Sequence, residues 1–336
     1  MQPSYPLGKL PADHLARLFD RYGTSGDRVV LGPGIGHDAA VVSFGDRYLV
    51  AKTDPITFAS EEIGWYAVHV NANDVACTGA TARWFLATVL LPQSGTDEAL
   101  VDEIFEQIAH TCEQLDIALV GGHTEITHGL ARPIVAGFML GEVAPDALVR
   151  PDGARPGDSV LLTKGIAVEG TAIIALERGA QLEEVERSLV ERSRRFLHEP
   201  GISVVRDAAV ATAAGKVHAM HDPTEGGLAT GLWELADGAE VGLIIEQDAI
   251  PILPETAILC QALGLNPLGL IASGALLLAV SANDAAEIEA ALEREGIAAA
   301  HIGQVVEREE GVTLRRPEGR QPLPRFDQDE ITRLFE

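Results

Sequence analysis

Blocks of apolar residues alternate with polar segments along the first half of the chain, in a pattern typical of mixed strands and helices. Residues Arg83–Leu91 (RWFLATVLL) form a dense apolar run that ends at Pro92, which predicts a buried strand. Apolar residues at near-helical spacing predict helices over Glu61–Cys77 and Asp97–Leu115. Shorter apolar runs predict further strands over Tyr48–Lys52, Ala118–Val120 and Pro133–Glu142.

The second half of the chain repeats this mixture. Because strands and helices are mixed in both halves, the predicted fold class is α/β or α+β. The predicted strands cover Ser159–Thr163, Val217–Met220, Leu243–Glu246, Ala275–Val280 and Ala299–Gln304. The predicted helices cover Gly170–Glu177, Leu182–Phe196, Ile202–Ala213, a segment from about Thr224, and Ala285–Arg294.

A segment rich in proline, glycine and charge separates the two halves. Residues Pro145–Asp158 (PDALVRPDGARPGD) have this composition, and apolar segments flank them. Such a segment is typical of a domain junction. A chain of 336 residues also suits two domains better than one. We therefore expect an N-terminal domain over residues 1–150 and a C-terminal domain over residues 151–336.

Composition narrows the choice of partners and compartment. The chain has 25 basic and 50 acidic residues, a net charge of −25, and such a surface repels nucleic acid and anionic membranes. No apolar run approaches the ~18 residues of a membrane span, and the first residues do not resemble a signal peptide. Cys77, Cys112 and Cys260 are too far apart for a disulfide framework or a metal knuckle. We therefore expect a cytoplasmic protein that binds neither nucleic acid nor membrane.

Five short segments place acidic residues beside glycines or small residues, near predicted strand ends or on a helix. The first is Gly32-Pro-Gly-Ile-Gly-His-Asp38. Gly34 and Gly36 let the backbone approach a ligand closely, and Asp38 follows directly. Taken alone, a tight turn before a strand explains this segment better.

The second segment, Lys52-Thr-Asp54, ends a predicted strand. Lys52 and Asp54 are two residues apart, so they lie on the same face of an extended strand. Ligand sites in α/β folds collect at such strand ends. A strand-ending turn with a solvated lysine explains the segment equally well.

The third segment gives the clearest signal. Asn71, Asn73 and Asp74 stand in an otherwise apolar helix, where such side chains compete for backbone hydrogen bonds. Burying them costs free energy unless they are paired. An exposed polar stripe does not fit the neighbouring Val70 and Val75, so a functional role is favoured.

In the fourth segment, Gly121-Gly-His-Thr-Glu125, a short strand is expected to run into a glycine turn. Backbone N–H groups at Gly121 and Gly122, next to Thr124, suit phosphate oxygens. Glu125 is a candidate ligand for a hard cation. His123 is a candidate acid or base, although a histidine beside such a turn is as often structural. A plain glycine turn is the alternative, and function is somewhat favoured.

The fifth segment, His221-Asp-Pro-Thr-Glu-Gly-Gly227, follows a predicted strand and precedes a predicted helix. Asp222 or Thr224 would cap that helix, which explains the segment well. In the functional interpretation, Asp222, Gly226 and Gly227 complete a cleft from the second domain.

Carboxylates near glycine turns suit Mg²⁺, which prefers oxygen ligands and is commonly held by one or two carboxylates plus substrate phosphates. The chain contains no G-x-x-x-x-G-K-[ST], no H-E-x-x-H and no C-x-x-C. A Walker-type NTPase and a zinc hydrolase are therefore not expected. The sequence favours Mg²⁺ bound together with substrate phosphates.

Taken in order, the five segments resemble the AIR (aminoimidazole ribonucleotide) synthase-related superfamily. Each motif is loose, but their order and spacing are specific, and the resemblance runs from about residue 30 to residue 305. The superfamily includes AIR synthetase, thiamine-monophosphate kinase, selenophosphate synthetase and the hydrogenase maturation protein HypE. The chain is most similar to the HypE branch.

The resemblance implies a two-domain PurM-like fold: an N-terminal α/β domain that dimerises through its sheet, and a C-terminal α/β domain that closes over ATP. It also implies attack by a substrate on the γ-phosphate. The residues expected to act in catalysis are Asp74, His123 and Lys52. The expected metal ligands are Asp38, Asp54, Asp74, Glu125 and Asp222. The residues expected to bind nucleotide are Gly34, Gly36, Asn73, Gly121, Gly122, Thr124, Gly226 and Gly227.

The chain also departs from the family patterns. HypE proteins end in Pro-Arg-Ile-Cys, whose cysteine carries the group being dehydrated, whereas Pro324-Arg-Phe326 stands here and no cysteine follows. The usual cyanide-ligand chemistry is therefore not expected. The reactive cysteine that selenophosphate synthetase has near its N-terminus is absent, and His123 stands where thiamine-monophosphate kinase has an aspartate.

The leading hypothesis is an ATP- and Mg-dependent homodimer that phosphorylates or activates an amide, carboxyl or phosphate oxygen of an unidentified small-molecule substrate. Two alternatives stay open. One is a non-catalytic nucleotide-binding scaffold with a protein partner in a metalloenzyme maturation pathway. The other is a phosphotransferase similar to thiamine-monophosphate kinase.

Overall fold

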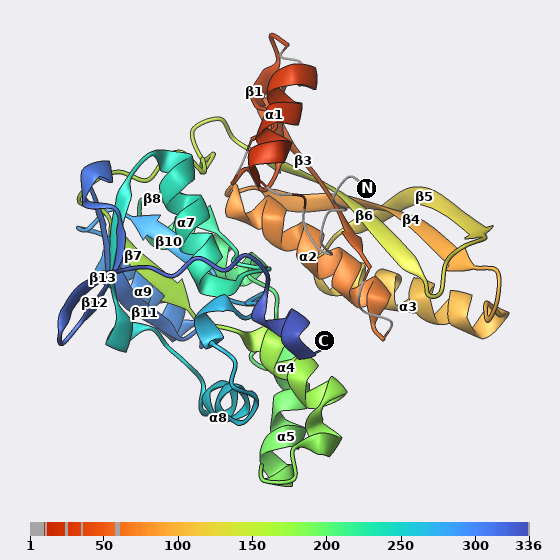
Figure 1. Cartoon of the computed structure of the whole chain (residues 1–336). Helices are drawn as coiled ribbons and strands as arrows, with labels where there is room; N and C mark the ends of the chain where they lie inside the picture. Colours follow the sequence, from red (N-terminus) through yellow and green to blue (C-terminus); the bar gives the residue numbers. More distant parts are fainter. Residues whose placement is uncertain (1–9, 11, 24–25, 35, 58–60, 335–336) are drawn as a thin grey trace.

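The computed structural model describes residues 10, 12–23, 26–34, 36–57 and 61–334 (Figure 1). In this part of the chain the strands form two sheets, one in each half, of six and seven strands. The predicted mixture of strands and helices in two sheet-containing domains is confirmed. The predicted junction lies between the last strand of the first sheet and the first strand of the second, and the division at residue 150 remains a prediction.

The first sheet has the strand order β1-β2-β3-β6-β4-β5, and all its pairs are antiparallel except β4–β5. Helices α2 and α3 pack on one of its faces through Ile63, Ala67, Ile104 and Ile108. The elements of this half are α1 (Ala12–Tyr22), β1 (Val29–Leu31), β2 (Ala40–Phe44), β3 (Arg47–Ile56), α2 (Ile63–Cys77), β4 (Thr81–Pro92), α3 (Glu98–Gln114), β5 (Ala118–Thr127) and β6 (Ile134–Val143).

The opposite face of the first sheet remains open. Residues on this face of β4 and β6 include Trp84 and Phe138, which are 36% and 41% exposed. Burial therefore alternates along β4 and β6, as expected for a sheet covered on one side only.

The second sheet has the order β13-β12-β9-β11-β7-β10-β8, with only β9–β12 parallel among the described pairs. Its elements are β7 (Ser159–Thr163), α4 (Val168–Glu177), α5 (Arg187–Arg194), α6 (Val205–Ala214), β8 (Val217–His221), α7 (Gly227–Ala239), β9 (Gly242–Glu246), α8 (Pro254–Leu263), β10 (Leu277–Val280), α9 (Ala285–Arg294), β11 (Ala299–Val306), β12 (Val312–Arg316) and β13 (Gly319–Pro322). Short 3₁₀ turns lie at Gly179–Gln181, Arg195–Leu197, Gln247–Ala249, Pro267–Gly269, Arg308–Glu310 and Glu330–Leu334.

Helices cover both faces of the second sheet, which explains the continuous apolar runs in its central strands. One face of β7 and β10 packs on α7, and the other packs on α6 and α9. Every residue of β7 and β10 is accordingly buried. The strands predicted here are confirmed, and the continuous apolar runs of β7 and β10 reflect burial on both sides.

Two predicted elements differ from the structure. The segment Leu182–Phe196 is not one helix, because α5 covers only Arg187–Arg194 and 3₁₀ turns flank it. The expected glycine turn at Gly121-Gly122 is wrong, because β5 continues through both glycines to Thr127, paired with β4. In the described part of the chain, no helix is long and apolar enough to cross a membrane.

Candidate functional site

Helix α2 lies between the two sheets (Figure 1). Its side chains pack with residues of both halves. Its C-terminal Ala76 and Cys77 pack with Val204 and Met220 of the second half. Helix α2 is buried along nearly its whole length, so its polar residues cannot face water. They must be paired within the protein or with a ligand.

An acidic cluster, formed by Asp38, Asp54, Asp74 and Asp222 around Lys52, lies beside α2. Strand β3 supplies Lys52 and Asp54. The ammonium group of Lys52 lies 3.5 Å from Oδ2 of Asp54 and 3.1 Å from Oδ2 of Asp74 on α2. Burial opposes the charge of Lys52, but Asp74, Asp54 and Asp38 outweigh burial, so the pKa of Lys52 is raised. The prediction that Lys52 and Asp54 share one strand face agrees with this geometry.

Asp74 is a buried carboxylate beside Lys52, at 6% exposed. Burial raises its pKa, Lys52 lowers it, and Asp222, Asp38 and Asp54 raise it further. Asp74 thus stands in a concentration of negative charge that one lysine does not balance.

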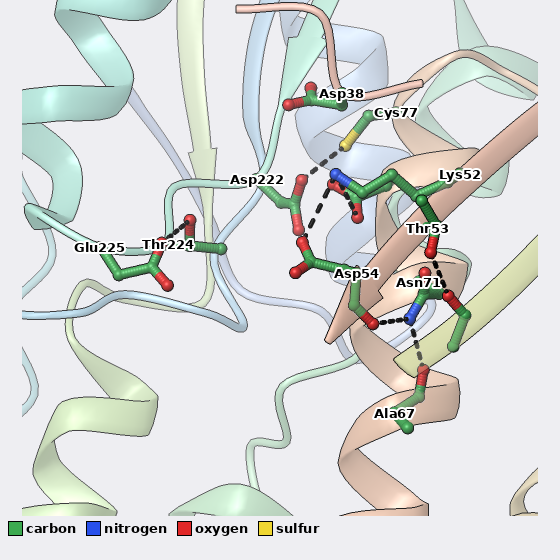
Figure 2. Close-up of polar contacts among 12 residues, drawn as sticks. Asp38, Lys52, Thr53, Asp54, Ala67, Asn71, Cys77, Asp222, Thr224 and Glu225 are labelled. Carbon is green, nitrogen blue, oxygen red and sulfur yellow. Dashed lines mark hydrogen bonds and ion pairs between the residues drawn. The ribbon is translucent and has the colours of Figure 1, made fainter. Parts of the chain in front are cut away.

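The end of β8 brings the second domain to the same place. The Cys77 thiol donates to Oδ1 of Asp222 over 3.4 Å. His221 lies 3.0 Å from Oδ2 of Asp38 through Nδ1 and 2.8 Å from Oε2 of Glu234 through Nε2. Figure 2 shows Asp38, Asp54 and Asp222 arranged around the amine of Lys52.

The pKa values of this second group reflect burial and charge together. Burial, followed by the charge of Asp38, raises the pKa of Asp222 to about 7. Burial lowers the pKa of His221, but Asp38 and Glu234 outweigh it, so the His221 pKa lies well above its usual value. An ion pair between the domains therefore joins Asp38 to His221.

This arrangement suits a divalent cation. Asp38, His221 and Asp222 each offer a ligand atom, and these atoms lie within 4.8 Å of one another. Asp54 and Asp74 add carboxylates beside Lys52. Burial raises the pKa of Asp74 and Asp222 most, and repulsion by neighbouring carboxylates raises it further. A bound cation relieves that repulsion. The residues present therefore fit Mg²⁺, and Asp38, Asp54, Asp74 and Asp222 would hold it.

Two asparagines of α2 form hydrogen bonds to backbone groups near the cluster. The Asn71 amide donates to the carbonyl oxygens of Asp54 and Ala67, over 3.2 and 2.8 Å. Asn73 donates to Ile202 O and accepts from Val204 N, both over 2.8 Å. Both polar groups of Asn73 thus bind backbone of the second domain, so its predicted role toward nucleotide stays a prediction.

We expect Asn73→Ala to destabilise the protein by about 2–4 kcal/mol, because it leaves the buried Ile202 C=O and Val204 N–H without partners. Urea unfolding measures this loss. Asn283→Ala, at an exposed turn position, is the matched control and should change little. Equal midpoints for Asn73→Ala and the unchanged protein would contradict this role.

The glycines of the first and fifth segments have structural reasons to be glycine. Gly36 has φ of 73°, and a side chain there would meet the Glu234 carbonyl oxygen at 3.2 Å. Gly34 packs against His37. Gly226 and Gly227 have φ of 78° and 64°, and Cβ atoms on them would lie 2.2 Å from Thr230 Oγ1 and 2.6 Å from Leu268 O. Their predicted contacts to nucleotide stay predictions.

Strand β5 is not brought to the cluster within one chain. The sheet register places Gly122 beside Ala87, then Gly137, then Asp54. Three strand spacings separate Gly122 from Asp54, roughly 14 Å. His123 and Glu125 are 65% and 54% exposed and contact each other over 3.3 Å. Gly121 and Thr124 lie on the same exposed strand.

Sequence analysis assigned no role to Glu169, a buried carboxyl group beside the fifth segment. Glu169 is the second residue of α4 and is 8% exposed, and its Oε2 has no hydrogen-bond partner among the described residues. Gly170 N–H donates to Ile271 O, and Ala272 N–H donates to Thr224 O, which ties this helix start to the Thr224 segment. No local motif marks Glu169, because its neighbours come from distant segments.

We expect the stability of the protein to fall as pH rises through the titration range of Glu169. Burial raises its pKa from 4.5 to about 7. The stability from the neutral form is complete below about pH 4.5 and is lost by about pH 7, a change of roughly 3 kcal/mol. Glu169→Gln cannot ionise, so its urea midpoint should fall less between pH 5 and pH 8 than that of the unchanged protein. The exposed Glu287→Gln is the control, and equal falls for all three proteins would contradict the assignment.

The chain is similar to known proteins over both of its halves. The model of the N-terminal domain of AIR synthase related proteins matches residues 36–143, and that of the C-terminal domain matches residues 155–315. The carbamoyl dehydratase HypE of Rhizobium leguminosarum is 31% identical over 280 residues, 81% of this chain and 77% of that protein. A crystal structure of HypE in complex with ATP has a TM-score of 0.69 at 25% identity and covers 97% of both chains. A HypE–HypF complex structure has a TM-score of 0.73 at 21% identity, covering 87% of this chain and 94% of that one, and shows likeness of fold alone.

Proposed function

Because the chain belongs to the AIR synthase related family, we propose that it binds Mg-ATP at the acidic cluster and uses it to phosphorylate or activate a small substrate. The observation that carries this proposal is the convergence of Asp38, Asp54, Asp74 and Asp222, from both domains, around Lys52 and His221. The similarity to a HypE solved with ATP supports the choice of nucleotide.

In this proposal, Asp38, Asp54, Asp74 and Asp222 hold Mg²⁺, which when bound neutralises charge on the β- and γ-phosphates. Lys52 turns from Asp74 to a phosphate oxygen. An amide, carboxyl or phosphate oxygen of the substrate attacks the γ-phosphorus. The bond from that phosphorus to the bridging oxygen breaks, and ADP leaves with the electron pair. His221 holds Asp38 in place through its hydrogen bond.

The reaction is tested by ATP turnover with candidate substrates from the amide, carboxylate and phosphate classes. Release of ADP that depends on both Mg²⁺ and one substrate class is the expected result. Tight Mg-ATP binding without turnover for any class would contradict catalysis and favour the nucleotide-binding scaffold. In that case a protein partner would be sought first.

We further propose that the open face of the first sheet binds a second copy of this chain. This face exposes Trp84 and Phe138 and also carries His123 and Glu125, through the register of β4 with β5. Exposed aromatic residues on a sheet face favour an interface. The second copy would cover the predicted site residues that lie far from the cluster in one chain.

We expect Phe138→Asp to convert a dimer into a monomer, because it places a charge in an apolar interface. Size-exclusion chromatography with light scattering measures the mass. Phe105→Asp, at a 37% exposed aromatic residue of α3, which covers the other face of the sheet, is the control and should leave the dimer intact. A monomeric unchanged protein, or a dimeric Phe138→Asp, would contradict this interface.

A further inference from the structure

A large cavity lies in the second domain, apart from the acidic cluster. Its volume is about 730 Å³, within the usual range for small-molecule sites. The residues that line it come from the end of β7, from α5 and the segment that follows it, from α6, from the start of α8, and from the loop before β11. None of the cluster residues Asp38, Asp54, Asp74 and Asp222 is among them.

The walls of the cavity carry four basic and four acidic side chains, in a protein with twice as many acidic as basic residues. Three ion pairs join six of these side chains across different elements. Arg192 contacts Glu255 over 3.0 Å, Lys164 contacts Asp207 over 3.2 Å, and Arg206 contacts Glu295. Ion pairs therefore join the elements that form the walls, and the lining carries no excess of either charge.

Two lining residues stand outside these pairs. Neither Arg195 nor Glu199 has a side-chain hydrogen bond or ion pair among the residues that the structure describes. Their backbones are joined by the hydrogen bond from Glu199 N to Arg195 O, over 2.8 Å. Side chains at this spacing start about 5–6 Å apart. One guanidinium and one carboxylate thus face the same cavity without neutralising each other.

Apolar side chains complete the lining. Phe196 and Ile297 are each 7% exposed, and Leu253 is partly buried beside them. A site of this kind pairs an apolar floor with a few polar groups that fix the orientation of a ligand.

We propose that this cavity binds a small zwitterion of the amino-acid class, whose carboxylate pairs with Arg195 and whose ammonium group pairs with Glu199. The guanidinium group accepts a carboxylate in a bidentate geometry, and the carboxylate of Glu199 accepts N–H bonds from an ammonium group. The apolar lining contacts the rest of the ligand. The other lining charges are already paired, so a ligand with a single charge leaves either Arg195 or Glu199 uncompensated.

The test is a binding assay on the full chain, without ATP, with L-amino acids at millimolar concentration as the probes. A thermal shift assay identifies the amino acid that raises the melting temperature most, and calorimetry measures its Kd. We expect Arg195→Gln and Glu199→Gln each to weaken the binding of that amino acid about 10- to 100-fold. Blocking the ligand's carboxylate as an amide, or its amine as an acetamide, should have the same effect.

The exposed Arg187→Gln and Glu183→Gln, which do not line the cavity, are the matched controls and should bind normally. Circular dichroism shows whether each variant is folded. Three results would overturn the proposal. No amino acid binds at millimolar concentration, or both cavity variants bind the amino acid as tightly as the unchanged protein does, or a simple carboxylate binds as tightly as the zwitterion. Because ATP is absent, these results are independent of the proposed reaction.

Discussion

Asp74→Ala should weaken Mg-ATP binding by about 100-fold and abolish substrate-dependent turnover. Asp74 is almost fully buried, lies 3.1 Å from Lys52 and interacts electrostatically with Asp38, Asp54 and Asp222. Removing it takes away one proposed ligand and leaves Lys52 paired with Asp54 alone, so the remaining carboxylates no longer surround the cation. Calorimetry with Mg-ATP and an ADP-release assay measure the two effects.

The control for this prediction is Asp152→Asn. Asp152 is exposed and pairs with Arg150 over 2.7 Å, in the connection between the two sheets. Its replacement removes the same charge from the protein without touching the cluster, and Mg-ATP affinity should stay within about twofold. Full ATP affinity and turnover in Asp74→Ala would show that the site has been placed wrongly.

Gly122→Ala should destabilise the protein by about 3 kcal/mol or more, and more than Gly121→Ala. A Cβ atom on Gly122 would lie 2.0 Å from the carbonyl oxygen of Ala87 on the neighbouring strand. Backbone cannot move aside without breaking the pairing of β4 with β5. Urea unfolding measures the difference.

Gly121→Ala is an unusually close control. Both glycines have φ near 150°, so both substitutions carry the same backbone strain. A Cβ atom on Gly121, however, would meet nothing within 4 Å. Insoluble Gly122→Ala beside soluble Gly121→Ala would agree with this account, whereas equal stability of the two variants would contradict it.

Much of the fold follows from local patterns. Strand β4 was predictable from its long apolar run, and helix α2 from the helical spacing of its apolar residues. Helix α9 was predicted with its observed bounds, Ala285–Arg294. Strand β5 was predicted only in part. A Gly-Gly pair usually marks a turn, but here the close approach of Ala87 requires glycine within an extended strand.

The candidate site was predictable where a local sequence pattern marks its residues. Asp74, Asn71 and Asn73 were singled out because polar residues in an apolar helix are costly. The pairing of His221 with Glu234 was not predicted, because the fold brings together the end of β8 and a residue of α7. Glu169 and the cavity around Arg195 were missed for the same reason: each depends on contacts between segments far apart in the sequence.

The most direct test of the central claim is calorimetric titration of the full chain with ATP, with and without Mg²⁺. The account predicts binding that depends on Mg²⁺, because the carboxylates around Lys52 repel the phosphates of ATP alone. No binding at millimolar ATP with Mg²⁺ present, or equal binding without it, would contradict a Mg-ATP site at this cluster.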